Sequence, residues 1–268
     1  MSLFQLFLVA IIQGITEFLP VSSSGHLILL PKLTGMADQG QVIDVAVHAG
    51  TLFAVVIYFW SDVRLALSGI PSLLRGKIDN QGAWLALCLG LATIPVVIFG
   101  LVLKVTGLDD AMRSVAVIGW TMLIFGLVLY WADQKGEQTK TASQWSLKDA
   151  FIMGLWQALA LIPGTSRSGI TITAGRYLGY AREDAAKLAM LMSIPAILAS
   201  GTLLGLEVAR GADAALARDG AIAAVFAFVA ALLALSLMMR LLKSVSFTPY
   251  VIYRVILGIV LIWIGYSA

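Results

Sequence analysis

The sequence predicts an all-α polytopic membrane protein, and three features carry that prediction. Hydrophobic residues make up 60% of the 268 positions and charged residues only 12%, with a mean hydropathy of +0.93. Soluble globular domains carry about 25% charged residues and under half apolar ones. The apolar residues gather in long runs, and two polar breaks interrupt that pattern at related positions. This composition excludes a soluble enzyme and a disordered chain. A nucleic-acid-binding protein is also excluded, because the 18 Lys and Arg residues form no dense cluster.

Six apolar runs are long enough to cross a bilayer, whose hydrocarbon core of about 30 Å needs roughly 20 residues of helix. They cover residues 44–60, 84–103, 114–131, 188–206, 221–239 and 250–266. Several end at Trp or Tyr, the residues that favour the membrane interface. We therefore expect six transmembrane helices.

Two further apolar stretches, 3–19 and 151–162, run into polar breaks instead of crossing. The breaks read Pro20-Val21-Ser22-Ser23-Ser24-Gly25-His26 and Pro163-Gly164-Thr165-Ser166-Arg167-Ser168-Gly169. Shorter apolar segments follow at 27–33 and 170–178. A helix that breaks at membrane depth frees backbone groups which lipid cannot satisfy, so the break must be buried in protein or line a wet cavity. Each stretch is therefore predicted to be a re-entrant hairpin or broken helix.

The two breaks belong to an internal repeat. A shift of 144 positions aligns residues 2–35 with 146–179, and nine of these 34 positions are identical without a gap. They include the pairs Gln13/Gln157 and Ser22/Ser166. Three spans separate the copies, so the second copy enters from the opposite face. The sequence thus predicts a single membrane domain over residues 1–268, an inverted repeat with halves of about 1–134 and 135–268. Each half holds one broken hairpin and three transmembrane helices.

Loop charges give the predicted orientation. Loops 61–83, 132–149 and 240–249 hold eight Lys or Arg residues, and the opposite side holds about five, namely Lys32, Lys104, Arg113, Arg210 and Arg218. Basic loops stay on the cytoplasmic side. Both termini and the mouth of the first hairpin are then expected to face outward, on the periplasmic side of a bacterial inner membrane.

Charged or titratable side chains inside apolar segments are candidates for function, because burying them in a membrane is costly. Those recognised in the sequence are Glu17, His26, Asp44, His48 and Arg167. Gln13 and Glu17 are four residues apart and share a helix face. With the hydroxyls and His26 that follow, they suit binding of a hard cation, proton transfer or attack on phosphorus.

The second break suits an anion. Its glycines let backbone approach a ligand, its free N–H groups and hydroxyls donate, and Arg167 supplies a planar fork for phosphate oxygens. Structural interpretations compete with these. Arg167 could pair with a buried carboxylate, Ser22–Ser24 could join helices, and Asp44 with His48 could form a helix pair that supports the site. Glu17, His26 and Arg167 favour function more strongly, because all three lie at related breaks.

Both motifs resemble those of the bacterial undecaprenyl-diphosphate phosphatases, the bacitracin-resistance family. The first signature is residues 13–26, from Gln13 to His26, and the second is 163–171, from Pro163 to Thr171. The resemblance covers essentially the whole chain. It implies hydrolysis of undecaprenyl diphosphate to the monophosphate and phosphate, which recycles the lipid carrier for peptidoglycan and confers bacitracin resistance. The implied partners are the polyprenyl diphosphate and membrane lipid, and a homodimer stays an open alternative.

The resemblance also assigns roles by position. Gln13 and Glu17 match the pair associated with a divalent cation, Mg²⁺ or Ca²⁺. His26 matches the essential histidine, with Ser23 and Ser24 as neighbouring hydroxyls. The phosphate-binding string is matched by Gly164, Ser166, Arg167, Ser168 and Thr171. Asp44 and His48 keep a supporting role.

The mechanism expected from the sequence places the diphosphate between the hairpins, held by Arg167 and the 164–169 backbone. Three nucleophiles stay open: Ser23, His26, or a water activated by Glu17. The competing function class is transport, in which the same site would carry an anion or flip a phosphorylated lipid. A pure transporter needs no nucleophile and should tolerate loss of His26 better than loss of the anion clamp.

Overall fold

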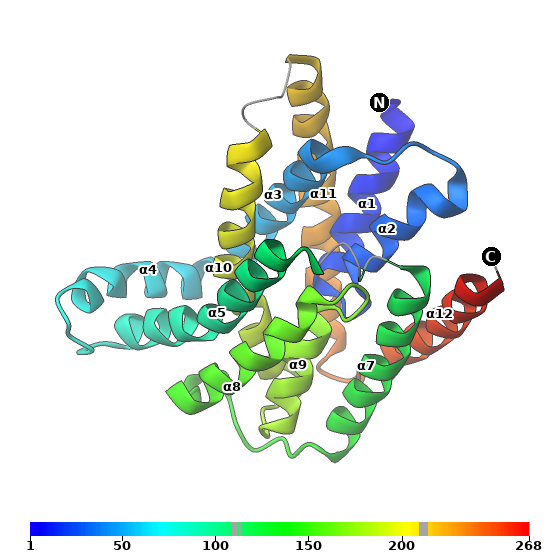
Figure 1. Cartoon of the computed structure of the whole chain (residues 1–268). Coiled ribbons are helices and arrows are strands. Elements are labelled where there is room, and N and C mark those ends of the chain that lie inside the picture. The colour runs from blue at the N-terminus through cyan, green and yellow to red at the C-terminus, as the bar shows by residue number, and fades with distance from the viewer. Residues whose placement is uncertain (109–111, 113, 209–213, 268) are drawn as a thin grey trace.

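The computed structural model of the chain describes residues 1–108, 112, 114–208 and 214–267 (Figure 1). Arg113 and Arg210, counted above among the outer charges, lie outside the described residues. The described parts contain helices and no strand. The α-helices are α1 (Leu3–Phe18), α2 (Ser23–Thr34), α3 (Gly40–Tyr58), α4 (Trp60–Leu74), α5 (Gln81–Thr106), α7 (Val115–Lys135), α8 (Leu147–Ala158), α9 (Arg167–Tyr177), α10 (Arg182–Val208), α11 (Ala214–Leu241) and α12 (Thr248–Ser267), with short 3₁₀ turns η1 (Ala142–Gln144) and η2 (Leu159–Leu161).

The predicted membrane spans are confirmed. Within the described residues six helices, α3, α5, α7, α10, α11 and α12, are long and apolar enough to cross a bilayer, and each overlaps one of the six predicted runs. The expected loop at 61–83 is wrong in one respect, because its first half is helix α4. Gly69 of α4 lies against the backbone of Gly82 in α5, so the two helices form a close hairpin on one side of the molecule (Figure 1). This helix has 15 residues and carries Asp62 and Arg64, so it is shorter and more polar than a membrane span.

Both predicted breaks are present and share one local geometry. Among the described non-glycine residues, only Ser22 and Ser166 have a positive φ, 72° and 70°. Each serine then caps the helix that follows: Ser22 Oγ accepts from the Gly25 N–H at 3.3 Å, and Ser166 Oγ accepts from the Gly169 N–H at 3.1 Å. This left-handed conformation costs a non-glycine residue about 1–2 kcal/mol, so surrounding contacts must hold both turns.

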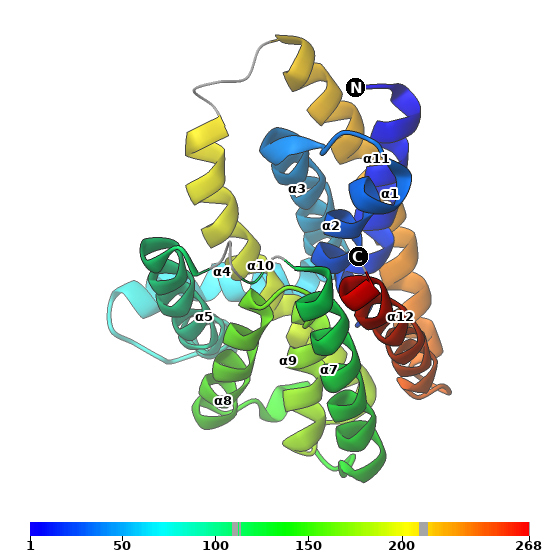
Figure 2. The ribbon, with the colours of Figure 1, turned by 45° about the vertical axis from the view of Figure 1, so that its right-hand side comes forward.

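The two hairpins enter the molecule from opposite ends and meet near its middle. In both views α1 runs inward from the end where the N-terminus lies, whereas α8 runs inward from the other end (Figures 1 and 2). The packing partners also correspond between the halves: α1 packs on α11 and α8 packs on α5, while α7 packs along α12. These pairings are the ones that an inverted repeat requires, and the repeat itself stays a prediction.

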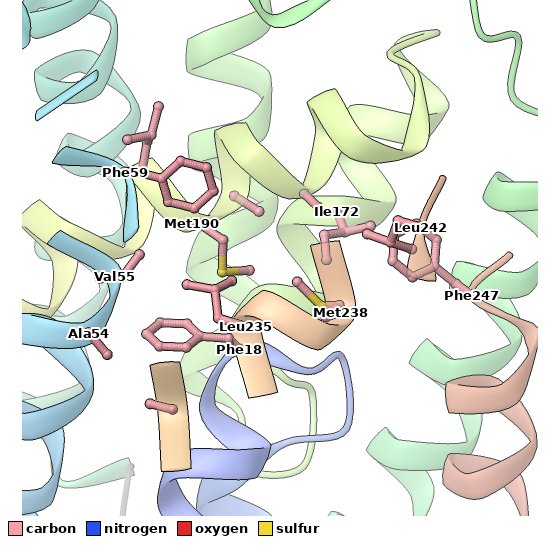
Figure 3. Packing of buried hydrophobic residues seen from close by; sticks show 14 of the residues in the cluster. Phe18, Ala54, Val55, Phe59, Ile172, Met190, Leu235, Met238, Leu242 and Phe247 are labelled. Atoms are coloured by element: carbon pink, nitrogen blue, oxygen red, sulfur yellow. The ribbon is translucent and has the colours of Figure 1, made fainter. Parts of the chain in front are cut away.

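The central core fixes the inner end of the first hairpin. Phe18, the last residue of α1, is buried in a cluster with Val55 of α3, Met190 of α10 and Leu235 of α11 (Figure 3). Buried aromatic and aliphatic side chains of this size each contribute roughly 1.5–3 kcal/mol. The core therefore holds the position from which the first break starts.

A charged cluster fixes the outer end of the second hairpin. Arg176, at the end of α9, is fully buried and donates to the Asp133 carboxylate at 3.0 Å and to the backbone oxygens of Asp133, Gly136, Glu137 and Tyr180. Arg182 of α10 donates to the same Asp133 oxygen at 2.8 Å. The cluster ties α7, α9 and α10 together, and the sequence analysis did not recognise it.

Close packing between helices predicts that an added methyl group lowers stability at a contact position but not at an open one. A side chain on Gly50 of α3 would collide with the Ala224 carbonyl oxygen of α11, because small residues let these backbones approach. We expect Gly50→Ala to lower stability by about 1–3 kcal/mol. Thermal unfolding in detergent measures this. The matched control is Gly90→Ala on α5, where a Cβ would meet nothing within 4 Å; an equal response of the two variants would contradict the packing argument.

Candidate active site

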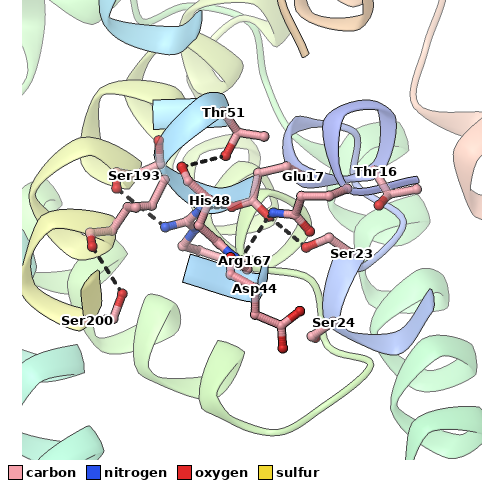
Figure 4. Close-up of polar contacts among 12 residues, drawn as sticks. Thr16, Glu17, Ser23, Ser24, Asp44, His48, Thr51, Arg167, Ser193 and Ser200 are labelled. Atoms are coloured by element: carbon pink, nitrogen blue, oxygen red, sulfur yellow. Dashed lines mark hydrogen bonds and ion pairs between the residues drawn. The ribbon is translucent and has the colours of Figure 1, made fainter. Parts of the chain in front are cut away.

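Glu17 is the centre of a buried polar cluster at the meeting point of the two breaks (Figure 4). Its side chain is 4% exposed and lies on the last turn of α1. Glu17 Oε2 accepts from Gln13 Nε2 at 2.8 Å, one helical turn earlier, and from Ser23 Oγ at 2.7 Å, on the first turn of α2. The predicted grouping of Gln13, Glu17 and Ser23 is therefore present in the structure.

Arg167 pairs with Glu17 across the two halves of the chain. Arg167 Nη2 donates to Glu17 Oε1, and Nη1 donates to the Ser193 carbonyl oxygen of α10 at 3.3 Å. The arginine side chain is 19% exposed, whereas that of Glu17 is 4% exposed. Arg167 begins α9 as Ser23 begins α2, and helix N-termini favour anions. Both the functional and the structural interpretation of Arg167 are thus compatible with its contacts.

Two contacts fasten the breaks to each other. Ser168 Oγ donates to the Leu19 carbonyl oxygen at 2.9 Å. Arg254, fully buried on α12, donates to the carbonyl oxygens of Pro20 (3.2 Å), Gly164 (3.3 Å) and Thr165 (2.9 Å). These bonds satisfy the oxygens that the breaks expose, as buried backbone groups require.

His48 lies closer to Glu17 than its predicted supporting role implied. Its Nε2 is 3.8 Å from Glu17 Oε2, and its Nδ1 bonds the Asp44 carbonyl oxygen at 2.7 Å. The Asp44 side chain accepts from Gln39 Nε2 at 2.9 Å. The His48 side chain is 39% exposed, so it lies between the buried carboxylate and open space (Figure 4).

His26 has a different environment. Its Nδ1 bonds the Ser22 carbonyl oxygen at 2.6 Å, and its Nε2 bonds the Tyr253 hydroxyl of α12 at 2.6 Å. The contacts of this ring within the described residues do not reach Glu17 or Arg167. The expectation that His26 groups with those two side chains therefore has no support in the hydrogen bonds, although Ser22 and Ser23 connect them along the chain.

The remaining residues of the predicted phosphate-binding string mostly shape the turn. Gly164 has a φ of 87°, and a Cβ there would collide with the Thr121 hydroxyl. Ser166 Oγ caps α9, and Thr171 Oγ1 donates to the Arg167 carbonyl oxygen at 2.7 Å. Ser24, in contrast, is exposed beside the cluster. Of this set, Arg167 and the backbone at the start of α9 are the groups best placed to meet an anion.

Sequence reasoning missed Tyr253 and Arg254. A signal for Arg254 was present, since it is a charged residue within the apolar run 250–266. Glu17 and Arg167 were selected because burying a charge in an apolar segment is costly, and the same holds for Arg254. Tyr253 gave no such signal, because tyrosine is common near the ends of membrane helices. Only the packing of α12 brings it to His26.

The donor set at Glu17 fits a hard cation. No group of three His, Cys, Asp or Glu side chains comes together for a metal within the described ranges. Gln13 Oε1, however, is buried beside Glu17 and has no hydrogen-bond partner. An orphaned amide oxygen, a carboxylate and the Ser23 hydroxyl are the oxygen ligands that Mg²⁺ and Ca²⁺ prefer. The predicted assignment of Gln13 and Glu17 to a cation therefore stays a prediction with a chemical basis.

Comparison with known proteins agrees with the resemblance seen in the motifs. The family model "Bacitracin resistance protein BacA" matches residues 6–260. Proteins named undecaprenyl-diphosphatase from Dinoroseobacter shibae and Roseobacter denitrificans are 73% and 72% identical to the chain, and the similarity covers 100% of each chain. One with the same name from Maricaulis maris is 46% identical over 98% of both chains.

The buried ion pair makes a prediction about stability. In Arg167→Met the Glu17 carboxylate keeps its burial but loses its cation, which costs about 3–5 kcal/mol for a buried pair. Glu17→Gln removes the charge that would be left unpaired. We expect the double variant Glu17→Gln with Arg167→Met to recover part of the stability lost in Arg167→Met, as measured by thermal unfolding in detergent. Simple addition of the two losses would show that the pair is not coupled.

Proposed function

The chain belongs to the bacitracin resistance protein BacA family and acts as an undecaprenyl-diphosphatase, and we propose that the Glu17–Arg167 pair is its reaction centre. The reaction adds water across the phosphoanhydride bond of a lipid diphosphate and yields the lipid monophosphate and phosphate. One observation carries the assignment of the centre. A carboxylate and a guanidinium from the two halves of the chain meet beside a serine hydroxyl, at breaks where helices α2 and α9 begin.

Binding of the substrate separates the ion pair between Glu17 and Arg167. Arg167 is the partly exposed member, and its planar fork matches two oxygens of the terminal phosphoryl group. When Arg167 turns to the phosphate, the Glu17 carboxylate loses a partner and becomes a stronger base. Charge that develops on the phosphoryl oxygens is then stabilised by Arg167 and by the N–H groups at the start of α9.

The geometry favours two of the three nucleophiles considered above. Ser23 Oγ donates to Glu17 Oε2 at 2.7 Å, the spacing of a nucleophile and its base. Glu17 takes the Ser23 proton, a bond forms from Ser23 Oγ to the terminal phosphorus, and the bond from that phosphorus to the bridging oxygen breaks. The lipid monophosphate leaves, and water then releases phosphate from Ser23. A water activated by Glu17 would give the same products in one step.

A divalent cation fits this scheme through Gln13 Oε1, the Glu17 carboxylate and Ser23 Oγ. When bound, Mg²⁺ or Ca²⁺ would neutralise charge on the diphosphate. The side chains of Gln13 and Ser23 have a role without it as well, because both hold Glu17 in one orientation. Loss of either should therefore weaken turnover even at saturating cation.

The polyprenyl tail has an apolar place on the other side of α1. A groove of about 610 Å³ lies between α1, α11 and the start of α12, and it runs past Leu19 at the first break. Ile11 and Ile15 line the groove, whereas Gln13 and Glu17 lie on the opposite face of the same helix. A substrate at the break can thus keep its diphosphate among polar groups and its tail in apolar surroundings.

The protein is a multi-pass membrane protein, and we place it in the bacterial inner membrane with the mouth of the site on the periplasmic side. The distribution of basic residues between the loops supports this orientation. It allows the site to receive a diphosphate from the outer leaflet.

Phosphate release from undecaprenyl diphosphate by the purified protein in detergent tests the proposal. We expect release that EDTA abolishes, and a loss of about 10²-fold in kcat for Arg167→Ala, since one charge-assisted donor to a transition state is worth ~3 kcal/mol. Glu17→Ala should lose at least as much. Arg64→Ala, which removes an exposed cation on α4, is the matched control and should keep full turnover.

Absence of release from folded wild-type protein that still binds the lipid would contradict hydrolysis and favour transport. Flipping of the lipid in liposomes would then be the next assay. Wild-type turnover in Arg167→Ala would instead contradict only the assignment of Arg167.

Filling the groove tests the position of the tail. Ala234→Trp should expel about two methylene groups of the tail, which costs ~1.6 kcal/mol and raises KM for undecaprenyl diphosphate about tenfold. The KM for farnesyl diphosphate should change less, because its shorter tail leaves much of the groove empty. Ala199→Trp fills a separate apolar pocket of about 400 Å³ and is the control. Equal effects of the two variants, or of one variant on both substrates, would contradict the assignment.

A further inference from the structure

Two adjacent residues of α12 hold the first break at both ends. Arg254 donates to the carbonyl oxygen of Pro20, where the break begins. Tyr253 bonds His26, where the break closes, and the two rings stack with centroids 5.7 Å apart and planes 8° apart. Neither residue touches Glu17 or Arg167 through a described hydrogen bond, so neither is accounted for by the reaction centre itself.

The hydrogen bonds of His26 fix the direction of the contact with Tyr253. A carbonyl oxygen can only accept, so His26 Nδ1 carries the proton that bonds the Ser22 oxygen. In the neutral ring Nε2 is then an acceptor, and the Tyr253 O–H donates to it. With both nitrogens engaged, the imidazole has one tautomer and one orientation.

The Ser22 carbonyl that His26 holds belongs to a strained residue. Ser22 has a φ of 72°, and the next residue is Ser23, whose hydroxyl lies 2.7 Å from Glu17. A change in the Ser22 backbone would therefore move Ser23 directly. The series of contacts runs from the Tyr253 hydroxyl to the His26 ring, from that ring to the Ser22 carbonyl, and along one peptide bond to Ser23.

Arg254 gives Tyr253 a fixed position from which to act. The Arg254 guanidinium is fully buried and bonds the Pro20, Gly164 and Thr165 carbonyl oxygens, so α12 cannot slide relative to either break. Tyr253, the next residue, is 44% exposed and contributes little to the core. Its hydroxyl is thus held in place without being needed for the fold.

We propose that Tyr253 is a positioning residue for the phosphatase reaction, acting through His26 to hold Ser23 against Glu17. This inference rests on the proposed function, and in it His26 also positions the nucleophile and does not attack phosphorus itself. It adds α12 to the elements that set the rate, although α12 contributes no group to the reacting atoms.

Steady-state phosphate release tests this proposal. Removal of a hydrogen-bonding partner that orients a reacting group typically costs 10–100-fold in activity, so Tyr253→Phe should lower kcat about tenfold. The KM should change by less than about twofold, since Arg167 and the groove are intact. Tyr266→Phe, on the exposed far end of α12, is the matched control and should keep wild-type kcat. Equal kcat in Tyr253→Phe and Tyr266→Phe would overturn the proposal.

Variants of His26 separate positioning from direct chemistry. The Nδ2 of His26→Asn takes the place of Nδ1 and can still donate to the Ser22 carbonyl, whereas His26→Ala cannot. We expect His26→Asn to retain at least tenfold more kcat than His26→Ala, and Tyr253→Phe to have no further effect in the His26→Asn background. Equal inactivity of the two His26 variants, or independent losses in the double variant, would overturn it. Wild-type release serves as the reference throughout, so failure of the proposed function would appear separately.

Discussion

The ion pair between Glu17 and Arg167 is the constraint on which the rest of the structure depends. Charged side chains at membrane depth are stable only when they are paired, and these two come from residues 150 positions apart. To bring them together, both halves of the chain must stop a helix in the middle of the molecule and turn. The two serines with positive φ, Ser22 and Ser166, are those turns. The proposed reaction centre and the unusual backbone are therefore one feature.

Interrupted helices leave carbonyl oxygens that lipid cannot satisfy, and the protein supplies donors to them from neighbouring helices. Arg254 reaches three such oxygens from α12, Ser168 reaches Leu19, and the Thr121 hydroxyl donates to the Pro163 oxygen at 2.6 Å. A buried guanidinium is expensive unless it is fully hydrogen-bonded. The hydrogen bonds of Arg254 offset the cost of burying its charge, and this one side chain joins both breaks to α12 and fixes the distance between them.

Helix α1 has one polar face and one apolar face, which suit the two parts of a lipid diphosphate. Its polar face carries Gln13 and Glu17, and its apolar face, with Ile11 and Ile15, forms a wall of the groove. A diphosphate needs donors and a base, whereas a long isoprenoid tail needs apolar surface. Because the break ends α1 beside Leu19, a lipid can pass from one face to the other at the point where we propose that hydrolysis occurs.

The sequence alone determined the membrane class, the six spans, the two breaks and most residues of the cluster, because these depend on local composition and on short motifs. Gln13 and Glu17 share a face through helical periodicity, and Ser23 follows within six residues, so their proximity needed no knowledge of the fold. Helix α4 was not predicted, because it is shorter and more polar than a membrane span. The tertiary structure decided that His48 lies beside Glu17 and that His26 turns to Tyr253. Those contacts depend on how α3 and α12 pack against the hairpins, and packing between segments far apart in the chain leaves no local pattern in the sequence.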